Sequence, residues 1–294
     1  MNPANEPFAV RAAPALFVLL WSTGFIVTKL ALHATQPLTW LSIRMAVTIC
    51  LLLVIVAVTR PAWPRGWQVL HSIVAGLLVQ CVYLAGVTLA IGHAIPAGLS
   101  ALIPGLQPIL TSTLASRFLG ERVTPLQWAG LLLGLVGVVL VMHDRPLTGQ
   151  AGWGWIFSVA SLFGITLGTL YQKRFGGSID WRTGNILQFG ASGLCFLVGA
   201  MLFEPMTVSF IPELAIALSW ATVVLSIGSI ALLYWLIRRS GATQVASLFY
   251  LVPAVTAAMA FALFGERLDA LALGGMALCA VGVVIVNRAA ATST

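Results

Sequence analysis

Polar and aromatic side chains are scattered through long apolar stretches of this sequence, where their hydroxyl, amide and ring groups could together bind a small amphipathic molecule. A buried amide or hydroxyl is costly without a hydrogen-bond partner, so such groups tend to face one another or a cavity. We therefore expect a ligand site that draws on the following residues: Trp21, Ser22, Thr28, Lys29, Gln80, Tyr83, Ser100, Gln107, Tyr171, Ser229, Tyr234, Gln244 and Tyr250.

Catalytic and metal chemistry find little support in the remaining reactive residues. The cysteines and histidines are scattered without metal-ligand or redox spacing, so we expect no metal and no cofactor. The stretch "GASG" at 190–193 fits the G-x-S-G pattern of intramembrane serine proteases, with Ser192 as the nucleophile. Such a serine needs a histidine base, which in that family comes from a later helix. No histidine follows His143, so a protease is a remote alternative.

The composition places the chain in a membrane. Of its 294 residues, 60% are hydrophobic and only 8% are charged, and the mean hydropathy is +1.01. A soluble domain has about 25% charged residues. The net charge of +7 does not indicate a nucleic-acid partner, because the basic residues occur singly or in pairs between apolar runs.

Ten apolar segments follow from the breaks at charged, proline and glycine-rich points. Each has roughly the 20 residues that a helix needs to cross the hydrocarbon core. We expect an all-α integral membrane protein with helices at about 12–32, 38–59, 67–90, 96–117, 124–142, 152–172, 182–203, 213–236, 242–264 and 269–287.

The distribution of lysine and arginine predicts the orientation. If the N-terminus is cytoplasmic, eleven of these residues face the cytoplasm, and only Arg145 and Arg267 lie in outer loops. We therefore expect a multi-pass protein of a bacterial-type inner (plasma) membrane with both termini in the cytoplasm.

The second half of the sequence repeats part of the first. The stretches 117–141 and 262–286 each contain Gly-Glu-Arg before a glycine-spaced apolar run, 145 positions apart, and Pro108 pairs with Pro253 in the same register. The repeat unit has five segments, an odd number, so the second copy enters the membrane inverted. We expect two five-helix halves, 1–147 and 148–294.

Matched interruptions in the two halves predict where the helices are broken. Pro104, Pro108 and Pro253 each free a backbone carbonyl, which must face protein or a water-filled cavity. We expect these prolines to act as hinges. Glu121 and Glu266 either take part in gating or mark the starts of the helices that follow. The first of these helices has a capping box from Thr124 to Gln127.

Charges at membrane depth constrain the ligand. Lys29 and Arg44 either extend to the interface or hold an anionic group of the substrate or the protein. No Asp or Glu lies near the middle of a segment. A proton-driven exporter of cationic drugs usually needs such a carboxylate. This favours a neutral or zwitterionic substrate and leaves the driving force open.

The inverted ten-segment plan, the two Gly-Glu-Arg motifs, "WSTGFIVTK" at 21–29 and Arg44 in "WLSIRMAV" resemble the drug/metabolite transporter superfamily with its EamA-type repeats. Within it the chain is most similar to the YddG-like exporters of aromatic amino acids. The resemblance implies a secondary transporter, not an enzyme, that exports small amphipathic metabolites by alternating access. It also implies a central cavity lined by the first, third, fourth, sixth, eighth and ninth helices. A multidrug exporter of lipophilic cations is the alternative.

The expected partners are a small-molecule substrate and the lipid bilayer. The glycine-rich segments at 124–142 and 269–287 could pair within one chain or across a homodimer, because small residues allow close helix contact in either case. Both a monomer and a homodimer therefore stay open.

Overall fold

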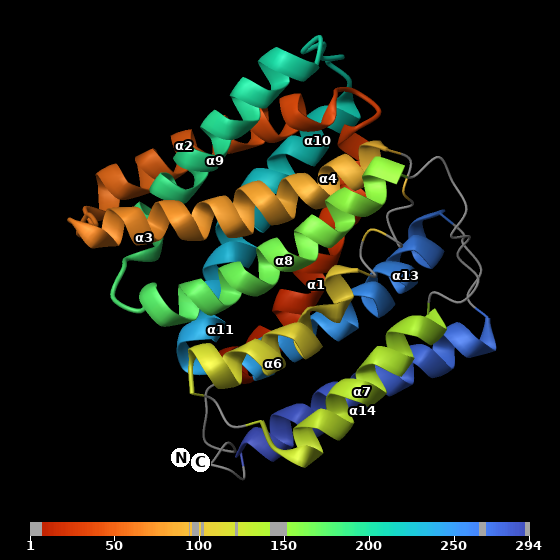
Figure 1. The fold of residues 1–294 in the computed structure, drawn as a ribbon. Coiled ribbons are helices and arrows are strands. Elements are labelled where there is room, and N and C mark those ends of the chain that lie inside the picture. The colour runs from red at the N-terminus through yellow and green to blue at the C-terminus, as the bar shows by residue number, and fades with distance from the viewer. Residues whose placement is uncertain are drawn as a thin grey trace.

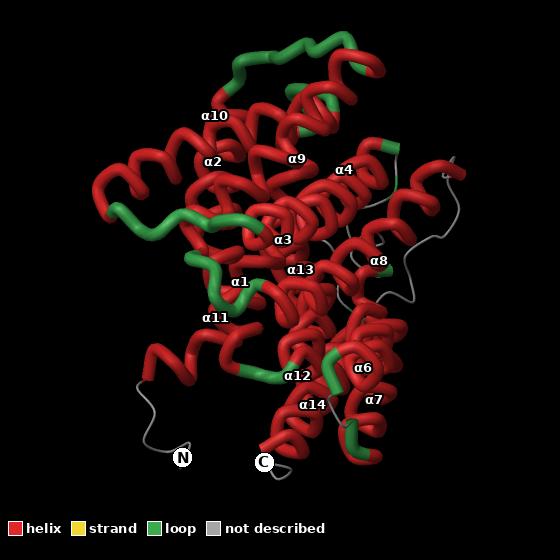
Figure 2. Tube along the Cα trace, turned by 60° about the vertical axis from the view of Figure 1, so that its left-hand side comes forward, coloured by secondary structure: helices red, strands yellow, loops and turns green. Residues whose placement is uncertain are grey.

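The computed structural model describes residues 8–93, 95, 100, 103–120, 123–141, 152–264 and 269–291. This part of the chain is helical apart from loops and one isolated bridge between Thr35 and Val208. The helices run between two ends of the molecule, where the loops gather (Figure 1). The start of α1 and the end of α14 lie at the same end in both views (Figures 1 and 2).

The helices fall in the ranges that hydropathy predicts. In the first half these are α1 (Phe8–Ala31), α2 (Pro37–Thr59), α3 (Trp67–Gly76), the π-helical η2 (Leu77–Leu84), α4 (Ala85–Gly92), the 3₁₀ turn η3 (Pro104–Leu106), α6 (Gln107–Phe118) and α7 (Pro125–Val141). In the second half they are α8 (Gly152–Phe175), α9 (Trp181–Phe203), α10 (Pro212–Ser219), the π-helical η4 (Trp220–Ser229), α11 (Ile230–Arg239), α12 (Ala242–Ser247), the 3₁₀ turn η5 (Leu248–Tyr250), α13 (Leu251–Phe264) and α14 (Ala270–Ala291).

Several of these helices are long and apolar enough to cross a bilayer. Within the described residues, six spans meet this condition: Ala12–Ala31, Pro37–Thr59, Trp67–Gly92, Trp153–Phe175, Trp181–Phe203 and Pro212–Arg239. Shorter apolar helices lie at Pro125–Leu140, Ala242–Thr256 and Leu273–Ala289. The chain is therefore a multi-pass membrane protein.

Local sequence signals define the helix starts. The capping box before α7 is confirmed, because the backbone N–H of Thr124 donates to Gln127 Oε1 at 2.8 Å and that of Gln127 donates to Thr124 Oγ1 at 3.2 Å. The Asp180 side chain accepts from the backbone N–H of Arg182 at the start of α9. Pro37 and Pro212 occupy the first turns of α2 and α10, where no intrahelical donor is needed.

Glycines bring α7 and α14 into backbone contact within one chain, and the two helices lie side by side (Figure 1). A Cβ atom placed on Gly130 would lie 2.9 Å from the Gly282 carbonyl, and one on Gly137 would lie 2.7 Å from the Gly275 carbonyl. The residue numbers in contact rise along α7 while they fall along α14, so the two helices are antiparallel. The glycine-rich segments thus pair inside the monomer.

A second antiparallel pair is formed by α2 and α9. A Cβ atom on Gly193 would lie 3.0 Å from Met45 Cβ, and one on Gly199 would lie 3.0 Å from Leu38 Cδ1. The carboxylate of Glu204, just after α9, accepts the backbone N–H groups of Leu38 and Thr39 at 2.8 Å each. This carboxylate therefore caps the start of α2, where the helix dipole favours an anion.

At the same end of the molecule, the loop between α1 and α2 is joined to the loop between α9 and α10. The bridge between Thr35 and Val208 is flanked by a hydrogen bond from the Ser209 backbone N–H to the Ala34 carbonyl at 2.8 Å. The Thr35 hydroxyl donates to the Thr207 carbonyl at 3.0 Å.

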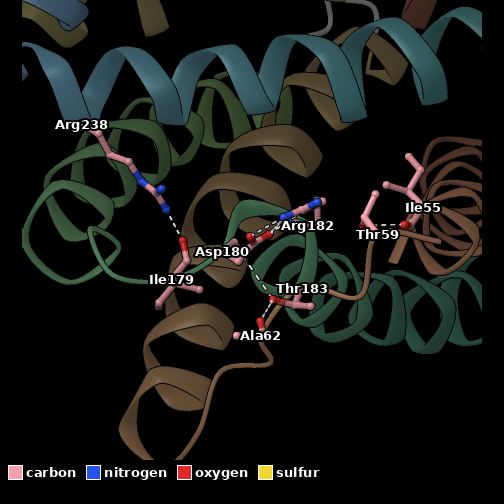
Figure 3. A network of polar contacts seen from close by, with 8 residues as sticks. All are labelled: Ile55, Thr59, Ala62, Ile179, Asp180, Arg182, Thr183 and Arg238. Atoms are coloured by element: carbon pink, nitrogen blue, oxygen red, sulfur yellow. Dashed lines mark hydrogen bonds and ion pairs between the residues drawn. The ribbon is translucent and has the colours of Figure 1, made fainter. Parts of the chain in front are cut away.

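Basic side chains hold the loops together at the opposite end (Figure 3). Arg238 of α11 donates to the carbonyls of Gly176 and Ile179, and the Thr183 hydroxyl donates to the Ala62 carbonyl at 2.9 Å. Asp180 and Arg182 form an ion pair at 2.8 Å, and the hydrogen bond from Arg182 lowers the pKa of Asp180. Lys173 donates to carbonyls at the end of α11.

The helices are irregular in their middle parts. The span 67–92 passes through η2 and the span 212–239 through η4, and π-helical turns often mark functional sites. The 3₁₀ turns η3 and η5 interrupt the two proline-containing segments. Pro104 opens η3, Pro108 lies in the first turn of α6, and Pro253 follows η5 against Gly105.

Candidate functional site

A narrow cavity lies between α1, α2, η2 and η4. The space between its walls is about 490 Å³ when the open solvent at its mouth is included. Its walls combine polar and apolar side chains: Trp21, Gly24, Phe25, Thr28, Arg44, Val79, Gln80, Tyr83, Leu84, Val87, Leu225 and Ile230. Four of the residues expected from the sequence therefore line one cavity, namely Trp21, Thr28, Gln80 and Tyr83.

Aromatic rings form one wall of this cavity. The rings of Trp21 and Tyr83 are stacked with centroids 6.0 Å apart, and Trp21 Nε1 donates to the Tyr83 hydroxyl at 3.0 Å. Phe249 and Phe17 also pack against the indole, with ring centroids 5.4 and 5.1 Å from it. These contacts fix the ring plane of Trp21, which can then present a flat apolar face to a ligand.

Arg44 is the ionised side chain among the lining residues. It lies roughly 10 Å along the axis from the start of α2, at 1.5 Å per residue. Only 5% of its surface is exposed, so it does not extend to the interface. Its Nε donates to the Ser226 hydroxyl at 3.0 Å, and its charge interacts with Tyr83. The two terminal nitrogens are thus available to the cavity.

Gln80 is one of two glutamine side chains that lie next to the Tyr234 hydroxyl. The Tyr234 hydroxyl donates to Gln188 Oε1 at 2.5 Å, and the Gln80 side chain lies beside the same hydroxyl. Gln80 is 3% exposed, and its Nε2 has no hydrogen-bond partner in the described structure. Tyr234 is fully buried and therefore is not an interface anchor.

Other expected ligand residues are engaged elsewhere. The Ser22 hydroxyl donates to the Val18 carbonyl and more weakly to that of Val252, and the Ser229 hydroxyl donates to its own helix at Val224. Gln244 accepts the backbone N–H of Gly241 and so caps α12. Lys29 is exposed and does not line the cavity.

The remaining expected residues lie away from the cavity. The Tyr171 hydroxyl is 2.8 Å from His71 Nδ1, and its ring borders a separate crevice with Leu78 and Arg174. Gln107 donates to Thr169 at 3.2 Å. The buried hydroxyls of Ser100 and Tyr250 have no partner in the described part. Their part in ligand binding stays a prediction, as does the hinge role of the prolines. Glu121 and Glu266 lie outside the described residues.

Sequence reasoning missed the apolar walls, and it left the role of Arg44 open. Trp21, Gly24, Phe25 and Thr28 follow the i, i+3, i+4, i+7 pattern of one helix face. That pattern could have added Gly24 and Phe25 to the site, but it does not exclude Lys29, which lies four residues after Phe25 on the same face.

The candidate nucleophile of the protease hypothesis has a structural role. Ser192 is buried, and its hydroxyl donates to the Gly76 carbonyl at 3.0 Å, which ties α9 to the end of α3.

Comparisons with known proteins agree on membrane transport. The model of the EamA-like transporter family matches twice, at residues 13–143 and 152–288. The chain is 25% identical to the inner membrane transporter YedA of Escherichia coli K12 over 93% of this chain and 89% of that protein. It is 28% identical to a "Probable amino-acid metabolite efflux pump" of the same strain, over 92% of each. A solved crystal structure has the same fold, with a TM-score of 0.80 at 19% identity, over 98% of this chain and 99% of that one.

Proposed function

Because the chain belongs to the EamA-like transporter family, whose members are transporters and not enzymes, we propose that it exports small amphipathic metabolites, most of all amino acids including aromatic ones, across the inner membrane. The cavity carries this proposal. It joins the stacked pair of Trp21 and Tyr83 to a polar wall of Arg44 and Gln80, so it offers an apolar and a polar surface to one small molecule. The relative named as an amino-acid metabolite efflux pump supports the same substrate class.

The transport cycle is alternating access between two inverted five-helix halves, 1–147 and 148–294. The two matches to the family model support this division. The helix irregularities also recur in the register of the sequence repeat. An offset of 145 carries η2 from 77–84 to 222–229 within η4, and η3 from 104–106 to 249–251 beside η5.

The antiparallel contact between α7 and α14 supports the inversion independently. In the repeat, Gly130 corresponds to Gly275 and Gly137 to Gly282. The observed contacts are Gly130 with Gly282 and Gly137 with Gly275, so exchanging the halves turns one contact into the other. A pseudo-two-fold axis in the membrane plane produces this pattern.

Both termini are proposed to be cytoplasmic. Arg238 and Arg182 lie at the end of the molecule shown in Figure 3, and Lys173 binds the Ile237 carbonyl next to Arg238. An excess of cationic residues is typical of cytoplasmic loops. A single cysteine at Ser178, in a chain without the native cysteines, should be labelled only after the membrane is permeabilised. A cysteine at Thr207 should be labelled in intact cells, and the reverse result would overturn the orientation.

Export of lipophilic cations is the weaker candidate. The lining residues include a buried cation and no carboxylate, so the cavity repels a positive ligand. Aromatic faces alone attract a cation by roughly 0.5–2 kcal/mol.

Reconstituted proteoliposomes test the proposal. Uptake of radiolabelled phenylalanine, tryptophan and leucine is measured with and without a pH gradient, with tetraphenylphosphonium as a cationic competitor. We expect saturable amino-acid uptake that the cation does not inhibit. No saturable uptake above empty liposomes would reject amino acids, and strong inhibition by the cation would favour the alternative.

A further inference from the structure

The charge of Arg44 lacks a counter-charge in the described structure. An arginine stays ionised in proteins, and a buried ion is costly unless it is paired. None of the four described carboxylates, Asp180, Glu204, Glu213 and Asp269, forms an ion pair with Arg44, and Asp180 pairs instead with Arg182. Arg44 donates to the neutral hydroxyl of Ser226, and Tyr83 in the same cavity is neutral as well. An anion in the cavity would supply the missing partner.

Two neutral donors face the same cavity. Gln80 Nε2 is buried and makes no hydrogen bond to the described residues, although the Tyr234 hydroxyl lies beside this side chain, so Gln80 keeps a donor for a ligand. The Tyr83 hydroxyl accepts from Trp21, which leaves its own proton to be donated. Arg44, Gln80 and Tyr83 are therefore three donors in the lining of one cavity, which also has apolar side chains such as Leu225.

This arrangement favours a carboxylate over an ammonium group. The lining residues provide no anionic acceptor for a positive charge, whereas a carboxylate accepts hydrogen bonds at both oxygens. We propose that Arg44, with Gln80 and Tyr83, forms a carboxylate-binding subsite, so that the transported molecules are small carboxylates with an apolar body, and that an α-ammonium group is not required. This rests on the proposed export of amphipathic metabolites and narrows its substrate class.

Three ligands that differ by one group separate the possibilities. Phenylalanine has both charges, 3-phenylpropionate lacks the ammonium and phenylalaninamide lacks the carboxylate. Each is titrated by calorimetry into the full chain in lipid nanodiscs. We expect phenylalanine and 3-phenylpropionate to bind within about 10-fold of each other. Phenylalaninamide should bind at least roughly 10- to 100-fold more weakly, the factor for one charge-assisted hydrogen bond.

Variants of Arg44 test whether this residue causes the preference for the carboxylate over the amide. Arg44→Gln should bring the acid and the amide within about 3-fold of each other, and Arg44→Lys should restore part of the preference, because lysine keeps the charge without the fork of donors. Arg65→Gln is the matched control, since that arginine is exposed and does not line the cavity. It should leave all three affinities unchanged.

Thermal melting of the ligand-free protein tests whether Arg44 has only a structural role. Because the Arg44 charge is unpaired in the described structure, Arg44→Gln should melt at the same temperature as the wild type or higher. A large drop in melting temperature would mean that Arg44 has a partner in the protein, and it would overturn the subsite.

The binding outcomes distinguish the two proposals. If the acid and the amide bind equally well, amino-acid transport stands and the carboxylate subsite is wrong. If only 3-phenylpropionate binds, the subsite stands and amino acids are not the substrate. If none of the three binds, both proposals fail.

Discussion

Replacing Gly282 by alanine tests the crossing of α7 and α14, where the backbones of the two helices touch. A Cβ atom at this position would lie 2.6 Å from the Gly130 carbonyl oxygen and 2.8 Å from the Gly134 backbone nitrogen. Non-bonded heavy atoms prefer roughly 3.5 Å or more, so the helices must separate by about 1 Å. No side chain can rotate away, because both contacts are to backbone. Overpacking of this kind costs roughly 1–3 kcal/mol.

The matched control is Gly274→Ala in the same helix, because a Cβ atom there meets nothing within 4 Å. Both variants gain about 1 kcal/mol of helix propensity, so the difference between them isolates the clash. Thermal unfolding in one detergent, followed by fluorescence, should give a lower melting temperature for Gly282→Ala by roughly 2–4 °C per kcal/mol lost. Gly274→Ala should melt at or above the wild-type temperature. Equal melting of the two variants would refute the close crossing.

Three further predictions concern the cavity and the two ends of the molecule. Gln80→Ala or Tyr83→Ala should reduce transport by roughly 10-fold, the loss expected for one hydrogen bond in the cavity, while leaving the protein folded, and wild-type uptake by both would remove them from the site. Glu204→Gln should weaken the hydrogen bonds from the backbone of Leu38 and Thr39, so that a cysteine introduced in the α1–α2 loop reacts faster with a polar maleimide. An unchanged reaction rate would mean that these hydrogen bonds do not hold the loop in place. Because Arg182 lowers the pKa of Asp180, the ion pair should stabilise the protein above the unfolded pKa of about 3.9 and lose this effect as pH falls through the lower folded pKa. Asp180→Asn should therefore melt below the wild type at neutral pH and approach it in acid, and a gap that does not depend on pH would contradict the pairing.

The positions of the helices follow from the sequence because the bilayer imposes a length and an apolar composition on each span. The capping box at Thr124 was equally predictable, since its two hydrogen bonds involve residues three apart. Local rules of this kind need no knowledge of neighbouring helices.

The site was predictable only in part, because burial depends on which helices meet. Arg44 could have reached the interface from its place in α2, but packing against η4 holds it next to Ser226. Gln244 looked like a ligand residue, yet it is used by its own helix cap. Tyr171 pairs with His71 across two helices that the sequence does not relate.

The two π-helical stretches give the cavity walls a way to change shape. A π turn holds about one residue more than an α turn, so rewinding η2 into an α-helix would rotate the residues beyond it by roughly 100° and shift them by about 1.5 Å along the axis. Gln80 and Tyr83 lie within η2, and Ser226, which holds Arg44, lies within η4. A change of winding on either side would therefore move a donor relative to the cavity, while Arg238 ties the end of the second of these spans to the carbonyls of Gly176 and Ile179.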